Sequence, residues 1–175
     1  MQALDKLRIN PGNVGAGQHH DDNFRTMVEL IAKAGKVARI GVNAGSIDKE
    51  LLAKLLEENK RSASPVSDKE IFLRTMAESA MSSAKMAERY GLAPDHIVLS
   101  AKISNVPDLL TVYHDLNKRC PYALHLGLTE AGVGMKGVIS SAVALGILLH
   151  EGIGNTIRVS LTPKPGESRT QEVYA

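Results

Sequence analysis

The 175-residue sequence has very few aromatic or sulfur-containing side chains: no tryptophan, two phenylalanines, four tyrosines and one cysteine, Cys120. A single cysteine excludes an internal disulfide and cannot by itself hold an iron–sulfur cluster. Few aromatics, a net charge of +2 and no basic run longer than two residues argue against a nucleic-acid partner. The longest apolar run, at 138–149, has about 12 residues, too few to cross a membrane.

The rest of the composition is that of an ordinary folded protein. Hydrophobic residues make up 43% of the chain and charged residues 23%, which is enough to bury one core. We therefore expect residues 1–175 to form one domain. The N-terminal residues show no signal-peptide or transit-peptide pattern, so we expect a cytoplasmic location.

Five short apolar segments alternate with helical segments, and polar residues recur at every second position within them. Successive side chains of a β-strand point to opposite faces, so each segment has one polar face and one aliphatic face. In the aliphatic set are Leu7, Ile40, Leu99, Leu126 and Val159. The five segments are residues 6–10, 38–43, 97–102, 124–129 and 156–161.

Alternating strands and helices predict a parallel sheet with right-handed crossovers. Both faces of an open parallel sheet are normally apolar, whereas these strands direct cations to one face. A (β/α)8 barrel gathers polar side chains at the carboxyl ends of its strands, and such a mouth suits this pattern. The prediction is an α/β fold, a partial TIM-type barrel, since five strands do not close a barrel of eight. The alternative is a complete open domain of five strands.

Helices are expected between and after these strands, with boundaries uncertain by a few residues. Ser46 is a candidate cap for the second helix, and Ser67 with Glu70 forms a capping box for the third. Gly91 and Gly152 are candidate helix ends. The expected helices cover residues 22–34, the leucine-rich stretch after residue 46, and residues 68–91, 107–119 and 138–151, with another beginning near residue 170.

Four cations come from four different strands yet occupy similar positions near the strand ends: Arg8, Arg39, Lys102 and Arg158. Arginine binds phosphate through two parallel hydrogen bonds and lysine binds it as a point charge, so the set predicts a site for a multiply phosphorylated ligand. The alternative is that each cation pairs with a carboxylate. Neutral side chains expected to orient the ligand are Asn10, Asn43, Ser100, Thr129 and Ser160.

Two further residues sit beside this set. Glu130 directly follows the fourth strand and is a candidate catalytic acid or base, with a salt-bridge role as the equal alternative. His125 points to the same face one layer deeper. For His125, a hydrogen-bonded structural role is at least as plausible as a substrate contact.

Other motifs give weaker signals. The run from Gly132 to Gly137 matches GxGxxG, but no acidic residue ends a strand some 20 residues later, so an anion-cradling loop is favoured over a dinucleotide fold. The glycine-rich residues 11–15 are a second such loop. Residues 19–22, His-His-Asp-Asp, are favoured as a helix start over a metal site, and we expect no bound metal ion. Cys120 is expected to be an inert loop thiol.

Several of these segments, taken in order, are similar to the signatures of one enzyme family, the 4-hydroxy-3-methylbut-2-enyl diphosphate synthases. The resemblance spans essentially the whole chain with matching spacing. The segments that carry it are LRINPGN at 7–13, RIGVNAGS at 39–46, SAK at 100–102, HLGLTEAG at 125–132 and EGIGNTIRVSL at 151–161.

The resemblance implies a reductase of the non-mevalonate isoprenoid pathway. The family opens 2-C-methyl-D-erythritol 2,4-cyclodiphosphate with two electrons, which ferredoxin or flavodoxin delivers through a [4Fe-4S] cluster. By resemblance Thr129 and Glu130 lie beside the reacting carbon, and Glu130 is the candidate proton donor. The diphosphate-binding positions implied are Arg8, Arg39, Asn43, Lys102, Arg158 and Ser160.

In the family a C-terminal domain supplies three cysteines and a glutamate to the cluster and caps the barrel of the other subunit of a homodimer. This sequence lacks those ligands, and we expect it to represent the last five β/α units, without the first three strands or the iron–sulfur domain. We expect the isolated chain to be inactive. Alternatives are a silent diphosphate-binding fragment and a phosphate-ligand barrel of the pteroate synthase type. The family also allows a plastid location.

Overall fold

The computed structural model describes residues 3–11, 18–163, 166 and 170–175, and of residues 18–21 and 171 only the backbone. Within these residues a single sheet of five parallel strands runs in chain order. Its neighbours pair in sequence, so each strand is followed by a crossover to the adjacent position. The strands are β1 (Lys6–Ile9), β2 (Val37–Asn43), β3 (Ile97–Lys102), β4 (Ala123–Leu126) and β5 (Thr156–Ile157).

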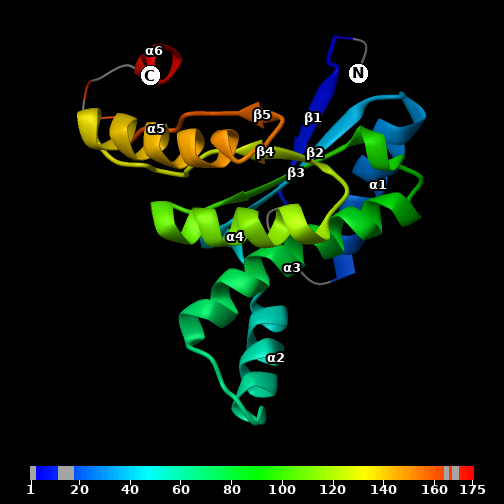
Figure 1. The fold of residues 1–175 in the computed structure, drawn as a ribbon. Coiled ribbons are helices and arrows are strands. Elements are labelled where there is room, and N and C mark those ends of the chain that lie inside the picture. The colour runs from blue at the N-terminus through cyan, green and yellow to red at the C-terminus, as the bar shows by residue number, and fades with distance from the viewer. Residues whose placement is uncertain (1–2, 12–17, 164–165, 167–169) are drawn as a thin grey trace.

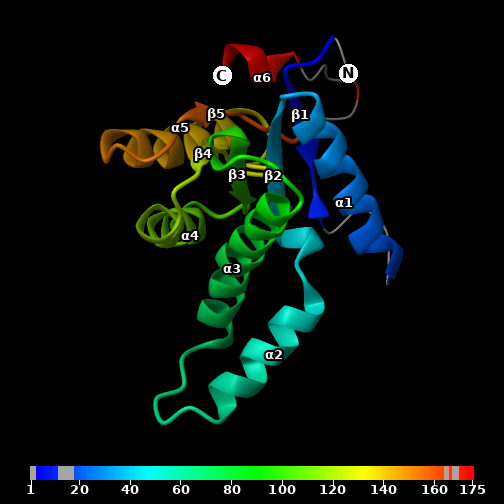
Figure 2. The same ribbon diagram turned by 90° about the vertical axis from the view of Figure 1, so that its right-hand side faces the viewer.

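The connecting helices lie outside a curled sheet. In Figure 2, α1, α3, α4 and α5 follow an arc around the strands, and the short α6 lies on the opposite, open side. This arrangement is a half-barrel of the α/β class, which confirms the predicted partial TIM-type fold. The helices are α1 (Gln18–Lys33), α2 (Lys49–Lys60), α3 (Asp68–Arg89), α4 (Val106–Arg119), α5 (Gly134–His150) and α6 (Gln171–Tyr174), with 3-10 turns η2 (Ala44–Ser46) and η3 (Pro94–His96).

The convex face of the sheet carries the aliphatic core. Ile40, Leu99, Ala101 and Leu126 are all 0% exposed, because α3 packs on β2 and β3 while α1 and α4 cover their flanks. Burying a side chain of this size is worth about 1.5–3 kcal/mol. The predicted separation of an aliphatic face from a polar one is confirmed for the three central strands.

The last two strands are shorter than expected. The fourth segment leaves the strand after Leu126 because Gly127 adopts a φ of +152°. The fifth keeps only Thr156 and Ile157, and Ile157 is 51% exposed instead of joining the aliphatic coat. Beyond them the chain continues as irregular backbone, with one further bridge between Val133 and Thr162. These residues bend inward over the carboxyl end of the sheet.

Helix starts follow the capping rules with one correction. The Ser67 hydroxyl accepts a hydrogen bond from the Glu70 amide, so the predicted capping box begins α3. Ser46 does not cap α2. Asp48 does so, accepting from the amides of Glu50 and Leu51 at 3.0 Å, because a carboxylate at this position reaches two free N–H groups. Helices α1 and α5 begin four residues earlier than expected, at Gln18 and Gly134.

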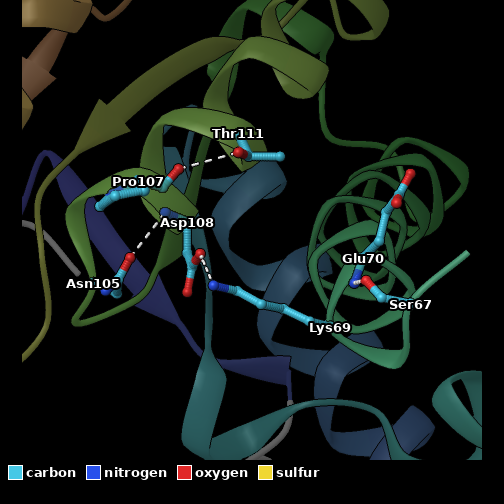
Figure 3. Close-up of polar contacts among 7 residues, drawn as sticks. All are labelled: Ser67, Lys69, Glu70, Asn105, Pro107, Asp108 and Thr111. Carbon is cyan, nitrogen blue, oxygen red and sulfur yellow. Dashed lines mark hydrogen bonds and ion pairs between the residues drawn. The ribbon is translucent and has the colours of Figure 1, made fainter.

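The start of α3 is tied to the start of α4. Lys69 donates to Asp108 at 2.7 Å, while Asn105 caps α4 by accepting from the Asp108 amide (Figure 3).

The α2 helix and the first part of α3 project away from the sheet (Figure 1). No residue of α2 is buried. None of the helices in the described parts of the chain is both long and apolar enough to cross a membrane.

Candidate functional site

A polar cavity of about 270 Å³ lies at the carboxyl ends of the strands. Eight of the nine residues named in advance as catalytic or substrate-binding line it, so the predicted convergence of the strand ends is found. Ser100, expected as a further polar neighbour, also lines it. The lining residues are Arg8, Arg39, Gly41, Asn43, Ser100, Lys102, Thr129, Glu130, Arg158, Ser160, Leu161, Thr162 and Pro163.

The ninth residue, Asn10, is not among the lining residues. Its side-chain amide donates to the Ser46 hydroxyl at 3.2 Å, and this contact links the end of β1 to η2. The Ser46 hydroxyl, which was expected to cap α2, is therefore engaged with Asn10. A substrate-binding role for Asn10 stays a prediction.

The four cations meet in this cavity from four segments. Arg8 on β1 is paired in register with Arg39 on β2, and Asn43 is paired with Lys102 on β3. Register partners in a parallel sheet share a face, so the pairing brings these side chains together. Arg158 arrives just after β5, and Lys102 is the most buried of the four at 8% exposed.

The cations shift one another's proton affinity. Burial, followed by repulsion from Arg39, Arg158 and Arg8 in that order of importance, lowers the pKa of Lys102 to about 8. Burial also lowers the pKa of Arg39, with Arg8 and Arg158 adding to the effect. An anion in the cavity would oppose this repulsion by favouring the charged forms.

One carboxylate that the sequence interpretation did not assign reaches the cavity edge. Glu172 on α6 accepts from the Arg158 guanidinium at 3.4 Å and from the Leu161 amide at 3.0 Å. The sequence indicated a helix here but gave no signal that it folds back over the strand ends. The alternative expectation, that cations pair with carboxylates, holds for Arg158. Arg8, Arg39 and Lys102 have no carboxylate partner among the described residues.

Glu130 is held in an unusual backbone conformation. Its φ is +50°, the only positive φ of a residue other than glycine in the described segments. The amides on both sides are bonded, Thr129 to the Ile103 carbonyl at 3.2 Å and Ala131 to the Ser160 carbonyl at 3.0 Å. The left-handed conformation costs a non-glycine residue about 1–2 kcal/mol. These two anchors place the exposed Glu130 side chain at the cavity rim.

His125 lies below the cavity. It is 4% exposed, and its two ring nitrogens contact Arg39 at 2.7 Å and the Thr156 hydroxyl at 2.8 Å. Burial and the nearby cations lower the pKa of His125 to about 3, so its imidazole is neutral at physiological pH. The expectation of a hydrogen-bonded histidine one layer deeper than the ligand site fits this geometry.

The backbone of His125 is fixed from the helix side. The Tyr113 hydroxyl of α4 donates to the His125 carbonyl at 2.6 Å and accepts from the Ala101 amide at 3.2 Å. The ladder between β3 and β4 pairs only Val98 with Ala123 and Leu99 with Leu124. Above those pairs, the phenol oxygen bridges the two strands.

The close approach of the Arg158 backbone to the chain just after β4 requires a glycine at position 127. A Cβ on Gly127 would lie 2.3 Å from the Arg158 carbonyl oxygen, and Lys102 Nζ would be 3.4 Å away. A Cβ on Gly137 would likewise lie 2.4 Å from the Gly132 carbonyl oxygen. Gly137 therefore allows this loop to pack against Leu161, and the Gly132 carbonyl accepts a hydrogen bond from the Thr162 amide.

Two expected features fall partly outside the described residues. Of the predicted loop at 11–15 only Pro11 is described, and the side chains of His19, His20 and Asp21 lie outside the described residues. Among the side chains that are described, no group of three histidine, cysteine, aspartate or glutamate residues is placed to hold a metal ion. Cys120 follows the end of α4 and does not line the cavity.

The fold and the cavity define a class: an α/β half-barrel with a cation-lined anion site at the carboxyl ends of its strands. The chain belongs to the GcpE family, because residues 1–175 match the model of the GcpE TIM-barrel domain. This match supports the resemblance to the 4-hydroxy-3-methylbut-2-enyl diphosphate synthases, enzymes of isoprenoid biosynthesis.

Proposed function

We propose that this chain is the substrate-binding part of a 4-hydroxy-3-methylbut-2-enyl diphosphate synthase and that its cavity binds 2-C-methyl-D-erythritol 2,4-cyclodiphosphate. The observation that carries the proposal is the convergence of four cations on one 270 Å³ cavity. Only one of them, Arg158, contacts a carboxylate within the described residues.

The charge balance of the cavity favours a diphosphate. Arg8, Arg39 and Lys102 share a partly buried space, and burial first, then repulsion between the cations, lowers the pKa of Lys102 to about 8. A ligand with two anionic phosphate groups offsets this repulsion and gives each guanidinium two oxygens to contact. Ser100, Thr129 and Ser160 line the same cavity and supply hydroxyl donors that orient the ligand.

Glu130 is the proposed proton donor to the substrate. It is the one acidic residue among the described residues that line the cavity, and Thr129 lies next to it. The two bonded amides on either side fix the backbone at Glu130, which lines the anion cavity.

The residues of this chain do not fit the [4Fe-4S] cluster that the family uses. A cluster of this kind is held mainly by cysteine thiolates, and this sequence has only Cys120, which does not line the cavity. We therefore derive no redox step from these residues. We propose that a separate domain supplies the cluster, receives electrons from ferredoxin or flavodoxin, and caps the cavity in a homodimer. Cytoplasm and plastid are both consistent with this proposal.

Titration calorimetry of the purified chain with the cyclic diphosphate tests the proposal. We expect saturable binding that the Lys102→Ala/Arg158→Ala double variant weakens by at least about 100-fold, because charge-assisted hydrogen bonds contribute about 1.5–3 kcal/mol each. The matched control is Lys54→Ala/Lys60→Ala on α2. This variant removes two cations from α2, which has no buried residue, and it should bind the cyclic diphosphate like the wild type.

Either of two outcomes would contradict the proposal. A folded wild-type chain that shows no binding means that these residues do not form the substrate site by themselves, as in the silent-fragment alternative. Preferential binding of a pterin phosphate over the cyclic diphosphate would favour the pteroate-synthase-type barrel. Circular dichroism of each sample separates loss of binding from loss of fold.

A further inference from the structure

The anion site contains one arginine that is held by a neutral partner. The Arg39 guanidinium contacts His125 Nε2 at 2.7 Å, whereas Arg158 is held by the Glu172 carboxylate. In both cases a hydrogen bond restrains a long side chain. The two partners differ in what they do to the charge: a carboxylate offsets it, and a neutral imidazole leaves it in full.

The contact fixes the tautomer of the imidazole. Guanidinium can only donate hydrogen bonds, so Nε2 must be the unprotonated acceptor nitrogen. Nδ1 then carries the proton and donates to the Thr156 hydroxyl at 2.8 Å. Thr156 is the register partner of His125 on the neighbouring strand β5, so the sheet itself places this acceptor.

The surroundings keep the ring neutral. His125 is 4% exposed, and the cations that act on it are Lys102 on β3, Arg39 on β2, Lys6 on β1 and Arg158 after β5. Each of these disfavours a further positive charge. The pKa of His125 is lowered to about 3, so the acceptor nitrogen stays available over the whole range in which proteins are usually studied.

Arg39 needs such a restraint because of its position. Its register partner on β3 is Val98, and its side chain spans that strand to reach His125 on β4. Three other cations line the same cavity; Arg8 and Arg158 lower the pKa of Arg39, and Lys102 and Arg39 repel each other. Without an acceptor at its far end, a side chain of this length would swing toward solvent.

We propose that His125 is a positioning residue which, with Thr156, holds the Arg39 guanidinium in the anion site without neutralising its charge. The proposal rests on the proposed function, because it assigns Arg39 to diphosphate binding. It adds a chain of hydrogen bonds that runs from Thr156 on β5 through His125 on β4 to Arg39 on β2 and includes neither the ligand nor a carboxylate.

A pair of isosteric amide variants separates positioning from simple structural support. In His125→Gln the amide oxygen reaches the place of Nε2 and still accepts from Arg39. In His125→Asn the shorter amide reaches only the place of Nδ1, so the contact with Thr156 is retained and that with Arg39 is lost. Calorimetry with the cyclic diphosphate should show about tenfold weaker binding for His125→Asn and less than about threefold for His125→Gln.

Two controls complete the set. Thr156→Val removes the acceptor of the Nδ1 proton and should weaken binding by about threefold. His96→Asn changes an exposed histidine whose contact is the neighbouring Asp95, and binding should be unchanged. Equal losses in His125→Asn and His125→Gln would overturn the proposal, since a merely structural histidine would not distinguish the two amides.

Nitrogen NMR of the imidazole gives a readout that does not depend on the ligand. We expect a neutral ring protonated at Nδ1 from pH 5 to 8, with the Nε2 resonance shifted by hydrogen bonding and changed in Arg39→Met. An ordinary titration near pH 6.5, or the other tautomer, would overturn the proposal even if the diphosphate binds. If the wild type fails to bind the diphosphate, the proposed function and this role in it both fall, whatever the resonances show.

Discussion

The two faces of the sheet differ in composition: the convex face is aliphatic and packed under helices, and the concave face is polar and cationic. On the convex face Ile40, Leu99 and Leu126 are 0% exposed and packed under helices. On the concave face Arg39 and Lys102 are held close to other cations, and burial lowers the pKa of both. One face supplies the stability of the fold, and the other uses part of that stability to keep like charges together.

Alternate residues of the same strand therefore have opposite effects on stability: the aliphatic ones stabilise the fold, and the buried cations destabilise it. Along β3, Leu99 and Ala101 face the helices while Ser100 and Lys102 face the cavity. A substitution on the convex face should therefore lower the stability of the fold with little effect on ligand binding. Removing a cation from the concave face should weaken ligand binding and raise the stability of the fold.

The largest change in stability is expected on the convex face. Leu99→Ala should lower the free energy of unfolding by about 3 kcal/mol, because it removes a fully buried side chain and leaves a cavity. Urea denaturation measures this loss. Affinity for the cyclic diphosphate in the folded protein should stay within about twofold, and a large drop would show that the two faces are not independent.

On the concave face, Lys102→Met should change the free energy of unfolding in the opposite direction. The substitution removes a buried cation and keeps most of its volume, so the free energy of unfolding should rise by about 2 kcal/mol at pH 7. The unfolded lysine holds its proton more tightly than the folded one, whose pKa is about 8. The destabilisation that Lys102 causes is therefore complete below pH 8 and disappears as the pH approaches 10.5, so the gain should shrink over that range.

Affinity should also depend on pH through the same residue. Above about pH 8 the free protein loses the Lys102 proton, whereas a bound anion favours the charged form. Binding should weaken by about tenfold per pH unit, or about 1.4 kcal/mol, until Lys102 titrates in the complex as well. Calorimetry from pH 7 to 10 measures the slope. Lys102→Arg stays charged and should give a flat profile, so a slope that persists in this variant would assign the effect to another group.

The smallest effect is expected at the cavity rim. Glu130→Gly should stabilise the fold by about 0.5 kcal/mol, because glycine adopts a φ of +50° without strain but loses more chain entropy on folding. Glu130→Gln keeps the strain and should leave stability unchanged. Thermal unfolding of the two variants side by side measures the difference, and equal melting temperatures would mean that the backbone strain at Glu130 is no larger than the entropy cost of the glycine.

The sequence allowed much of this arrangement to be predicted. The alternation of aliphatic and polar residues is a local signal, so strand faces, helix positions and the grouping of Arg8, Arg39, Lys102 and Arg158 followed from it. The cavity-lining role of Glu130 also followed from its place directly after a strand.

What could not be predicted depends on contacts between distant segments. Glu172 reaches Arg158 because α6 returns to the open side of the sheet, opposite the other helices, and no pattern near Glu172 indicates that path. The Asn10–Ser46 bond engages the hydroxyl that was expected to cap α2, and Asp48 is the cap instead. The early end of β4 depends on the approach of the Arg158 carbonyl to Gly127, a distance that spacing alone does not give.

The phenol group of Tyr113 has a consequence for how the cavity responds to its environment. It bridges Ala101 and His125 at the point where β3 and β4 stop pairing directly. Burial raises the pKa of Tyr113 to about 12, so this bridge carries no charge over the pH range in which Lys102, with a pKa of about 8, titrates. The shape of the cavity and its charge are thus set by separate groups, and the protein can change its electrostatic potential with pH while the spacing of its strands stays constant.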